Sequence, residues 1–201
     1  MAGKAIARGA EAEILEIELG GGKAAEKHRL AKGYRCRELD EKIRLERTRL
    51  EAMLLHRAKG AGVRTPLVLA VDPEKKSIFM EFVEGKNAKF AVKGNLKLCR
   101  EIGKQIAALH SADIIHGDLT TDNILATGKA DIVFIDFGLG FNSKKEEDKA
   151  VDLINLKKTL LAGDASLKKE WNAILKAYVA CGGSREIAGK IEEIERRGRY
   201  S

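Results

Sequence analysis

The chain has 201 residues, of which 44% are apolar and 33% charged, a composition that excludes a disordered or collagen-like protein and fits one globular domain or two small lobes. Lysine and arginine exceed aspartate and glutamate by 37 − 30 = 7, a modest basic excess of the sign that a nucleic-acid partner requires. Three widely spaced cysteines without a C-x-x-C pair argue against a disulfide framework or a zinc site, and no apolar run approaches the roughly 18 residues of a membrane span, so we expect a soluble cytoplasmic protein with no membrane contact.

The first sixty residues predict two strands and one long helix. Residues 12–19 alternate apolar and polar side chains, and the glycines at 20–22 indicate a turn into a second strand that ends near Arg29. We prefer a turn to a phosphate-binding loop at these glycines, because no helix follows them. A helical pattern then covers residues 40–59, with Asp40 as its expected N-cap.

The rest of the chain begins with strands and continues mostly with helices. Residues 68–71 and 78–83 predict a β-hairpin, and Glu84-Gly85-Lys86 breaks that pattern as a candidate hinge. Two further short strands are expected at 124–126 and 131–135. The predicted helices are residues 96–109, 146–161, 167–180 and 185–196.

Two motifs point to phosphoryl transfer. His116-Gly117-Asp118 is followed by Asn123, five residues after Asp118, and Asp136-Phe137-Gly138 begins eighteen residues after Asp118. Protein kinases use this order, with the first Asp as catalytic base and the Asn and second Asp on magnesium. We therefore predict Asp118 as the base or substrate anchor, and Asn123 and Asp136 as Mg²⁺ ligands. His116 is interpreted as a brace of this loop rather than a reacting group, and Asp122 as a turn cap.

A kinase site also needs a lysine for the phosphates and a helical glutamate to orient it. Lys27 lies near the end of the second predicted strand, and Glu51 lies in the predicted helix beside Leu54 and Leu55. A glutamate next to an apolar helix face usually has a charged partner, since an unpaired buried charge is costly. We predict a Lys27–Glu51 pair, with Lys23 as the rival lysine.

These elements and motifs predict an α+β protein with a minimal bilobal protein-kinase-like fold. We assign residues 1–83 to a small β-rich N-lobe with one long helix, 84–86 to the hinge, and 87–201 to a helical C-lobe with a basic C-terminal tail. That tail contains Arg196, Arg197 and Arg199, and a second basic segment covers residues 23–37. Each of the two is either a solvated surface or a contact for nucleic-acid phosphates.

The motifs RGAEAEI, KHRLAKGYR, HGDLTTDN, IDFGLG, EEDKAVDL and RRGR occur here in an order that resembles the small atypical kinase of the KEOPS (EKC) complex, over nearly the whole chain. The resemblance implies a serine/threonine protein kinase that autophosphorylates and is an ATPase within the complex, with ATP and Mg²⁺ as cofactors. It also implies a role in making N6-threonylcarbamoyladenosine in tRNA. The implied partners are the threonylcarbamoyl-transferase subunit, a small regulatory subunit and, through the complex, tRNA. The implied ATP-binding residues are Gly9, Ala10, Glu11, Lys27, Glu51, Glu81 and Val83.

Two departures from ordinary protein kinases are visible. The Gly-rich loop is reduced to Gly9-Ala10-Glu11-Ala12, so we expect weaker coverage of the phosphates. Only eight residues separate Gly138 from Glu147, with no A-P-E motif, so the usual segment for docking peptides is missing. These departures favour a dedicated partner or ATP hydrolysis over general protein phosphorylation.

Two alternatives stay open at this point. A small-molecule phosphotransferase of the aminoglycoside or choline kinase type also has an H-G-D-x-x-x-x-N loop, but the roughly sixty residues after Asp136 are expected to be too few for its acceptor pocket. A catalytically idle RNA-binding scaffold with a kinase shape is the other, against which the intact set of acidic, amide and lysine residues argues.

Overall fold

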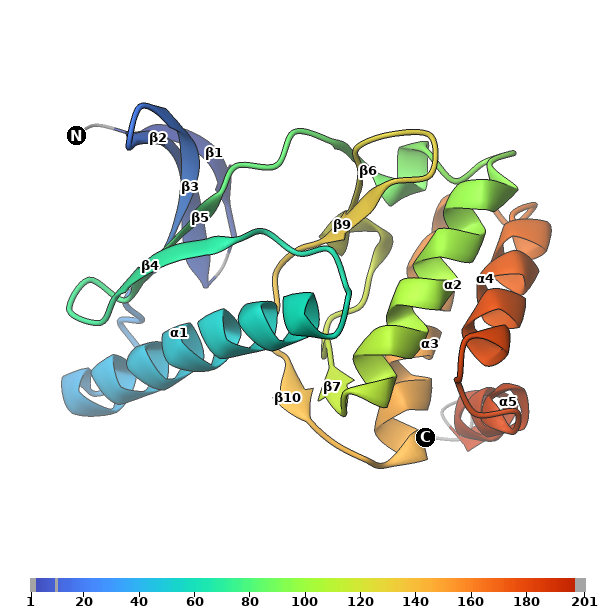
Figure 1. Cartoon of the computed structure of the whole chain (residues 1–201). Coiled ribbons are helices and arrows are strands. Elements are labelled where there is room, and N and C mark those ends of the chain that lie inside the picture. Colours follow the sequence, from blue (N-terminus) through green and yellow to red (C-terminus); the bar gives the residue numbers. More distant parts are fainter. Residues whose placement is uncertain (1–2, 10, 198–201) are drawn as a thin grey trace.

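The structure is a computed structural model that describes residues 3–9 and 11–197 (Figure 1). Its N-terminal part is an antiparallel sheet of five strands in the order β1-β2-β3-β5-β4, which places β3 at the centre. These strands are β1 (Lys4–Arg8), β2 (Ala12–Leu19), β3 (Gly22–Arg29), β4 (Val68–Asp72) and β5 (Ser77–Glu81). Helix α1 (Arg37–Gly60) lies along one face of this sheet and contacts β4 and β5.

The β2–β3 connection is the tight turn that its glycines predict. Leu19 pairs with Gly22, and the two residues between them, Gly20 and Gly21, have φ values of 62° and 82°. Two successive positive φ angles belong to a hairpin turn that glycine adopts without strain. The edge strand β1 was not predicted, because its five residues are all exposed and show no burial pattern.

Helix α1 begins one turn earlier than predicted, and the assignment of Asp40 as its N-cap is wrong. Cys36 occupies the N-cap position, and Asp40 lies within the first turn. Its carboxylate accepts hydrogen bonds from Arg44 Nε at 2.7 Å and from the backbone N–H of Lys32 at 3.3 Å. Asp40 therefore anchors the loop before α1 instead of capping the helix.

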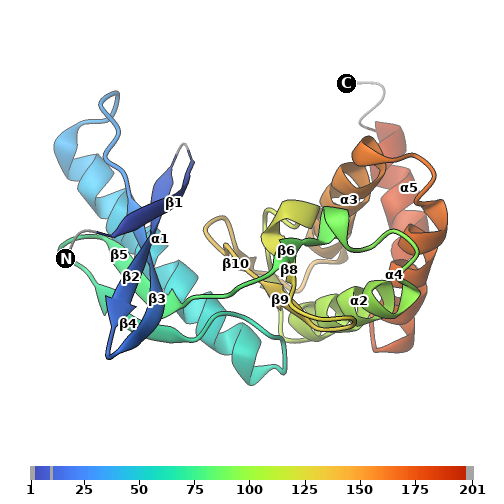
Figure 2. The same ribbon diagram turned by 90° about the horizontal axis from the view of Figure 1, so that it is seen from above.

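The C-terminal part is mainly helical (Figure 2). Its helices are α2 (Leu96–Ser111), α3 (Glu146–Gly163), α4 (Lys168–Ala180) and α5 (Ile187–Arg197), with 3-10 turns η1 (Ala88–Phe90) and η2 (Thr121–Asn123). Its short strands are β6 (Lys86–Asn87), β7 (Ile114–Ile115), β8 (Ile124–Ala126), β9 (Ile132–Phe134) and β10 (Phe141–Asn142). Helices α2 and α4 pack closely, since a Cβ on Gly103 would lie 2.1 Å from the carbonyl oxygen of Ile174.

One apolar core joins the two parts. It contains Leu54 of α1, Ile78 of β5 and Phe137 after β9, all almost fully buried. Residues 82–85 lead from β5 to β6, as Figure 2 shows, and the assignment of 84–86 as the hinge between lobes stays a prediction. Within the described part of the chain, no helix is long and apolar enough to cross a membrane.

The predicted basic tail is only partly described. Arg196 and Arg197 belong to the last turn of α5, where Arg197 Nη2 lies 3.0 Å from Glu147 Oε1. Arg199 lies outside the described residues.

Candidate active site

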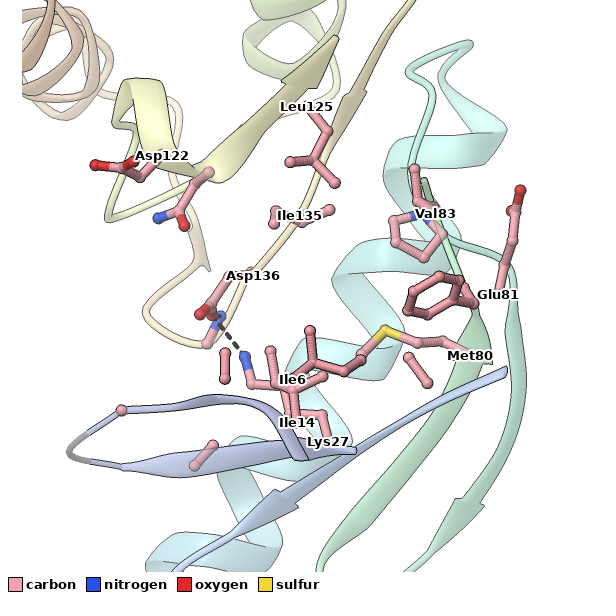
Figure 3. A pocket seen from close by; sticks show the side chains of 18 of the residues that line it. Ile6, Ile14, Lys27, Met80, Glu81, Val83, Asp122, Leu125, Ile135 and Asp136 are labelled. Carbon is pink, nitrogen blue, oxygen red and sulfur yellow. Dashed lines mark hydrogen bonds and ion pairs between the residues drawn. The ribbon is translucent and has the colours of Figure 1, made fainter. Parts of the chain in front are cut away.

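A cleft of about 1130 Å³ lies between the N-terminal sheet and the strands of the C-terminal part (Figure 3). Ile14, Ala25 and Met80 line it from β2, β3 and β5, while Leu125 and Ile135 line it from the other side. These apolar side chains form facing walls, an arrangement that suits a flat aromatic base. The charged and amide side chains of the two sequence motifs line the same cleft, so a base and its phosphates can both be held there.

Lys27 bridges the two halves of the site. Its Nζ donates to Glu51 Oε1 at 2.6 Å and to Asp136 Oδ1 at 2.7 Å, the second of which is drawn in Figure 3. The side chains of Lys27 and Glu51 are only 5% and 1% exposed, whereas that of Asp136 is 43% exposed. The predicted Lys27–Glu51 contact is therefore present, and Glu51 lies behind Lys27 rather than among the lining residues of the cleft.

Charges in this site shift the pKa values of both partners. Burial acts to lower the pKa of Lys27, but the carboxylates of Glu51 and Asp136 outweigh it and raise that pKa above its usual range. Burial acts to raise the pKa of Asp136, but the Lys27 ammonium and the Gly138 N–H outweigh it and hold that pKa below its usual range. Both groups are therefore charged at neutral pH, as phosphate and metal binding require.

Arg29 also belongs to the site, although the sequence predicted it only as part of the basic segment of residues 23–37. Its Nη2 donates to Glu51 Oε2 at 2.5 Å, and its side chain is 5% exposed. Lys27 and Arg29 are two residues apart on β3 and so lie on one face of the sheet. That i, i+2 spacing was the available signal, and both cations are too buried to contribute to a surface for nucleic acid.

Lys23 lies at the mouth of the cleft and does not replace Lys27. Its Nζ is 3.2 Å from Glu84 Oε1 and 3.6 Å from Glu16 Oε1, and its side chain is 60% exposed. It also lies 5.6 Å from the ring centroid of Phe82. The structure therefore gives the position between the helix acid and Asp136 to Lys27.

The loop after β7 brings Asp118 and Asn123 to the cleft. Asn123 Nδ2 donates to the backbone oxygen of Asp118 at 2.8 Å and to its Oδ2 at 3.0 Å. The 3-10 turn η2 shortens the chain between them, which explains how five residues bring the two side chains together. Asp136, at φ 61°, completes the set from the segment after β9.

His116 has the bracing position that we predicted. Its ring is buried and lies 4.5 Å from the ring centroid of Phe137, and its Nε2 lies 3.0 Å from the backbone oxygen of Ile135, within hydrogen-bond distance. This contact ties the loop of Asp118 to the segment that carries Asp136. The interpretation of Asp122 as a turn cap is wrong: its carboxylate contacts the side chains of Asn87 and Lys89, and the N-cap of η2 is Thr120.

The remaining predicted nucleotide ligands differ in their surroundings. Gly9, Glu11 and Val83 line the cleft, and Ala10 lies outside the described residues. Glu81 also lines it, but its carboxylate contacts Arg64 at 2.7 Å and the backbone N–H of Leu67 at 3.1 Å. Its backbone N–H also donates to the Leu67 carbonyl oxygen at 2.8 Å, so the carboxylate and the N–H of Glu81 both already have partners.

The donor atoms at Asn123 and Asp136 fit a magnesium ion. None of the described residues donates a hydrogen bond to Asn123 Oδ1 or to Asp136 Oδ2, whereas Asp136 Oδ1 accepts from Lys27 and from Gly138. Magnesium is commonly held by one or two protein oxygens, with phosphates and waters completing its shell. No cluster of three or more His, Cys, Asp or Glu suited to a metal occurs in the described part, which fits so sparse a ligand set.

A β-sheet part, a helical part and a cleft with this arrangement of lysine, acids and amide define a nucleotide-binding phosphotransferase of the protein-kinase-like class. A family model described as RIO domain matches residues 23–154. The chain belongs to the RIO-domain family. The Rio2 kinase of Chaetomium thermophilum has the same fold, with a TM-score of 0.56 over 96% of this chain and 71% of that one, at 15% identity.

Similar proteins are named for tRNA modification or for kinase activity. The "KEOPS complex subunit Bud32" of Pyrococcus abyssi is 42% identical, with 98% of this chain and 96% of that protein matched. The "Probable serine/threonine-protein kinase BUD32 homolog" of Archaeoglobus fulgidus is 39% identical, with 96% and 94% matched. A "Probable bifunctional tRNA threonylcarbamoyladenosine biosynthesis protein" of Methanobrevibacter smithii is 47% identical over 98% of this chain, which spans 36% of that protein.

Proposed function

We propose that the protein is an ATP- and Mg²⁺-dependent atypical serine/threonine kinase and ATPase that acts as a KEOPS subunit in tRNA N6-threonylcarbamoyladenosine synthesis. The observation that carries this proposal is the Lys27 ammonium, held at 2.6 Å from Glu51 and 2.7 Å from Asp136 inside the cleft. The names of the relatives support the tRNA-modifying role. The proposed partners are the threonylcarbamoyl-transferase subunit and a small regulatory subunit, with tRNA bound through the complex.

The cleft residues divide into a part for the base and a part for the phosphates. The apolar walls and the backbone of Glu81 to Val83 hold the adenine. Lys27 contacts the phosphates, and Glu51 orients Lys27 from behind. The short loop at Gly9 and Glu11 covers the phosphates less completely than a full Gly-rich loop does.

Asn123 and Asp136 hold Mg²⁺, which neutralises charge on the phosphates when it is bound. Asp118 positions the attacking hydroxyl or water and accepts its proton. The two hydrogen bonds from Asn123 to Asp118, of 2.8 and 3.0 Å, fix the carboxylate before the substrate arrives. Such preorganised positioning supplies a large share of catalysis in phosphoryl transfer.

The acceptor side favours ATP hydrolysis or one dedicated protein. The segment between Gly138 and α3 is short, and its residues Phe141 and Asn142 form β10, which pairs with β7. Little chain is left to bind an extended peptide. We therefore expect only slow phosphorylation of the protein itself or of generic proteins.

The deciding experiment measures Mg-dependent ATP turnover by the purified full chain, with and without unmodified tRNA and the two partner subunits. We expect turnover that rises when the partners and tRNA are added, and a loss of at least about 100-fold in Asp118→Asn. Asp131→Asn, which changes an exposed aspartate, is the matched control and should retain turnover. If turnover does not change when the partners and tRNA are added but rises with a small-molecule hydroxyl acceptor, the protein is instead a phosphotransferase of the aminoglycoside-kinase type.

A further inference from the structure

Charged side chains of alternating sign form a continuous chain through the site. It runs from α1 through the loop before β2 and back across the sheet to the segment after β9. In order, its members are Arg47, Glu11, Arg29, Glu51, Lys27 and Asp136. Each side chain contacts the next, so every member between the two ends has two partners of opposite charge.

The centre of this chain is a buried carboxylate held by two cations. Glu51 is 1% exposed, and each of its oxygens has a different partner: Lys27 at 2.6 Å on Oε1 and Arg29 at 2.5 Å on Oε2. A buried carboxylate that loses its only counter-charge is strongly unfavourable. Here Glu51 keeps one counter-charge even if the other moves away.

Lys27 carries one positive charge but has more than one anionic partner. It already contacts both Glu51 and Asp136, and under the proposed function it must also contact phosphates. Arg29 is less divided between partners. Besides Glu51, the acid it contacts is Glu11, whose Oε2 lies 3.9 Å from Arg29 Nη1. Arg29 is therefore the more constant partner of Glu51.

We propose that Arg29 is a positioning residue: it holds Glu51, and with Glu51 the helix α1, at the cleft independently of Lys27, so that the Lys27 ammonium is free to turn to the nucleotide. This proposal rests on the proposed function for the role of Lys27, and on the structure alone for the docking of α1. Arg29 also lines the cleft, but the role proposed for it is its contact with Glu51 and not a contact with the nucleotide. Arg29 acts through Glu51.

The segment after β9 leaves space for the guanidinium. A Cβ on Gly138 would lie 3.1 Å from Arg29 Nη2 and 2.9 Å from Asp136 Oδ1. A side chain there would press on both the arginine and the metal ligand. Glycine at 138 thus leaves room for both groups, which links this arginine to the same point of the site as Asp136.

The first test is amide hydrogen exchange along α1 in the full chain without nucleotide. We expect Arg29→Met to speed exchange of α1 amides by at least about tenfold, and Lys27→Met to change it by less than about threefold. Arg49→Met, on an exposed arginine of the same helix, is the control and should change nothing. Equal effects of the Arg29 and Lys27 substitutions, or a larger one for Lys27, would overturn the proposal.

A second pair of variants guards against misfolding. In Arg29→Met with Glu51→Gln no carboxylate remains at position 51, so this double variant should fold and show no faster α1 exchange than Glu51→Gln alone. Faster exchange in the double variant would mean that Arg29 acts through some contact other than Glu51, and would overturn the proposal.

The kinetic test separates positioning from bulk stability. Arg29→Met should raise KM for Mg-ATP about tenfold or more, and Arg29→Lys should restore most of it, because a lysine can still neutralise Glu51. An unchanged KM in a folded Arg29→Met enzyme would contradict the role. If the wild-type chain shows no ATP turnover, the proposed function fails, while the exchange experiment still decides whether Arg29 docks α1.

Discussion

The carboxylate of Asp152 accepts a hydrogen bond of 2.6 Å from the backbone N–H of His116. Its other oxygen accepts one of 2.9 Å from the N–H of Gly117. Asp152 lies in α3 and is 1% exposed, so a helix that follows this loop in the sequence fixes the backbone directly before Asp118. His110 Nε2 approaches the same carboxylate at 3.4 Å, which connects α2 to this anchor.

Replacing Asp152 should therefore damage both stability and catalysis. Asp152→Ala leaves the backbone N–H groups of the buried His116 and the half-buried Gly117 without these acceptors, at a cost of roughly 2–5 kcal/mol in the free energy of unfolding. Because the loop then shifts, ATP turnover should fall by more than about tenfold even where the protein is folded. Urea unfolding and turnover assays measure the two effects, with Asp131→Ala as an exposed control. A folded variant with normal turnover would show that α3 does not position the loop.

Gly117→Ala should be similarly harmful for a different reason. Gly117 has φ 79°, and a Cβ there would lie 2.0 Å from the carbonyl oxygen of Leu139. Backbone strain and this clash together should lower the free energy of unfolding by more than about 2 kcal/mol.

Gly189→Ala provides the control for Gly117→Ala with the opposite expected sign. Gly189 lies in α5, and a Cβ there meets nothing within 4 Å. Alanine should therefore stabilise the helix by about 0.5–1 kcal/mol. Urea unfolding of both variants checks the pair, and equal effects would contradict the structural account of Gly117.

The sequence predicted the parts of the site that depend on short spacings. The interval between Asp118 and Asn123 and the order of Asp136 after them led to one cleft, which the structure contains. Across long intervals, only the Lys27–Glu51 contact was predicted, and it came from the kinase template. The contact between Arg29 and Glu51, 22 residues apart, was missed because Arg29 looked like one cation of a solvated segment. The role of Asp152 was missed because an aspartate between apolar helical residues can equally face solvent.

Asp136→Ala should abolish Mg-dependent ATP turnover while the fold is retained. Asp136 is the proposed metal ligand, and charge neutralisation by the metal carries much of the catalysis in phosphoryl transfer. The fold should persist because Lys27 keeps its 2.6 Å contact with Glu51. Turnover, circular dichroism and Mg²⁺ titration together check this expectation. Near-normal turnover in the folded variant would remove Asp136 from the site.

The Lys27–Asp136 contact also predicts a pH dependence of stability. The pKa of Asp136 is lowered in the folded state, so its contribution is fully present above its unfolded pKa of about 3.9 and is lost as pH falls through the lower folded value. The pKa of Lys27 is raised, so its contribution is fully present below about 10.4 and is lost as pH rises through the higher folded value.

Unfolding free energies at pH 6 and pH 3 test the acidic side of this window. The difference between wild type and Asp136→Asn should shrink toward pH 3, because the unfolded wild type then binds a proton at Asp136 more readily than the folded protein does, whereas the variant has no carboxylate to protonate there. Asp131→Asn should differ little from wild type at either pH. A difference that stays constant from pH 6 to pH 3 would mean that the Lys27–Asp136 ion pair does not contribute to stability.

Lys27 and Glu51 should behave as one unit in activity. If Glu51 serves only to orient Lys27, the double variant Lys27→Met with Glu51→Gln should lose little more turnover than Lys27→Met alone, because the glutamate has nothing left to orient. Kinetics of both single variants and the double variant give the coupling, with Lys23→Met as the matched control at the cleft mouth. That control should lose less than about threefold, since the Lys23 side chain is 60% exposed and its ion pairs are with Glu84 and Glu16 at the cleft mouth. Additive losses from Lys27 and Glu51, together with a large loss in Lys23→Met, would instead assign the phosphate contact to Lys23.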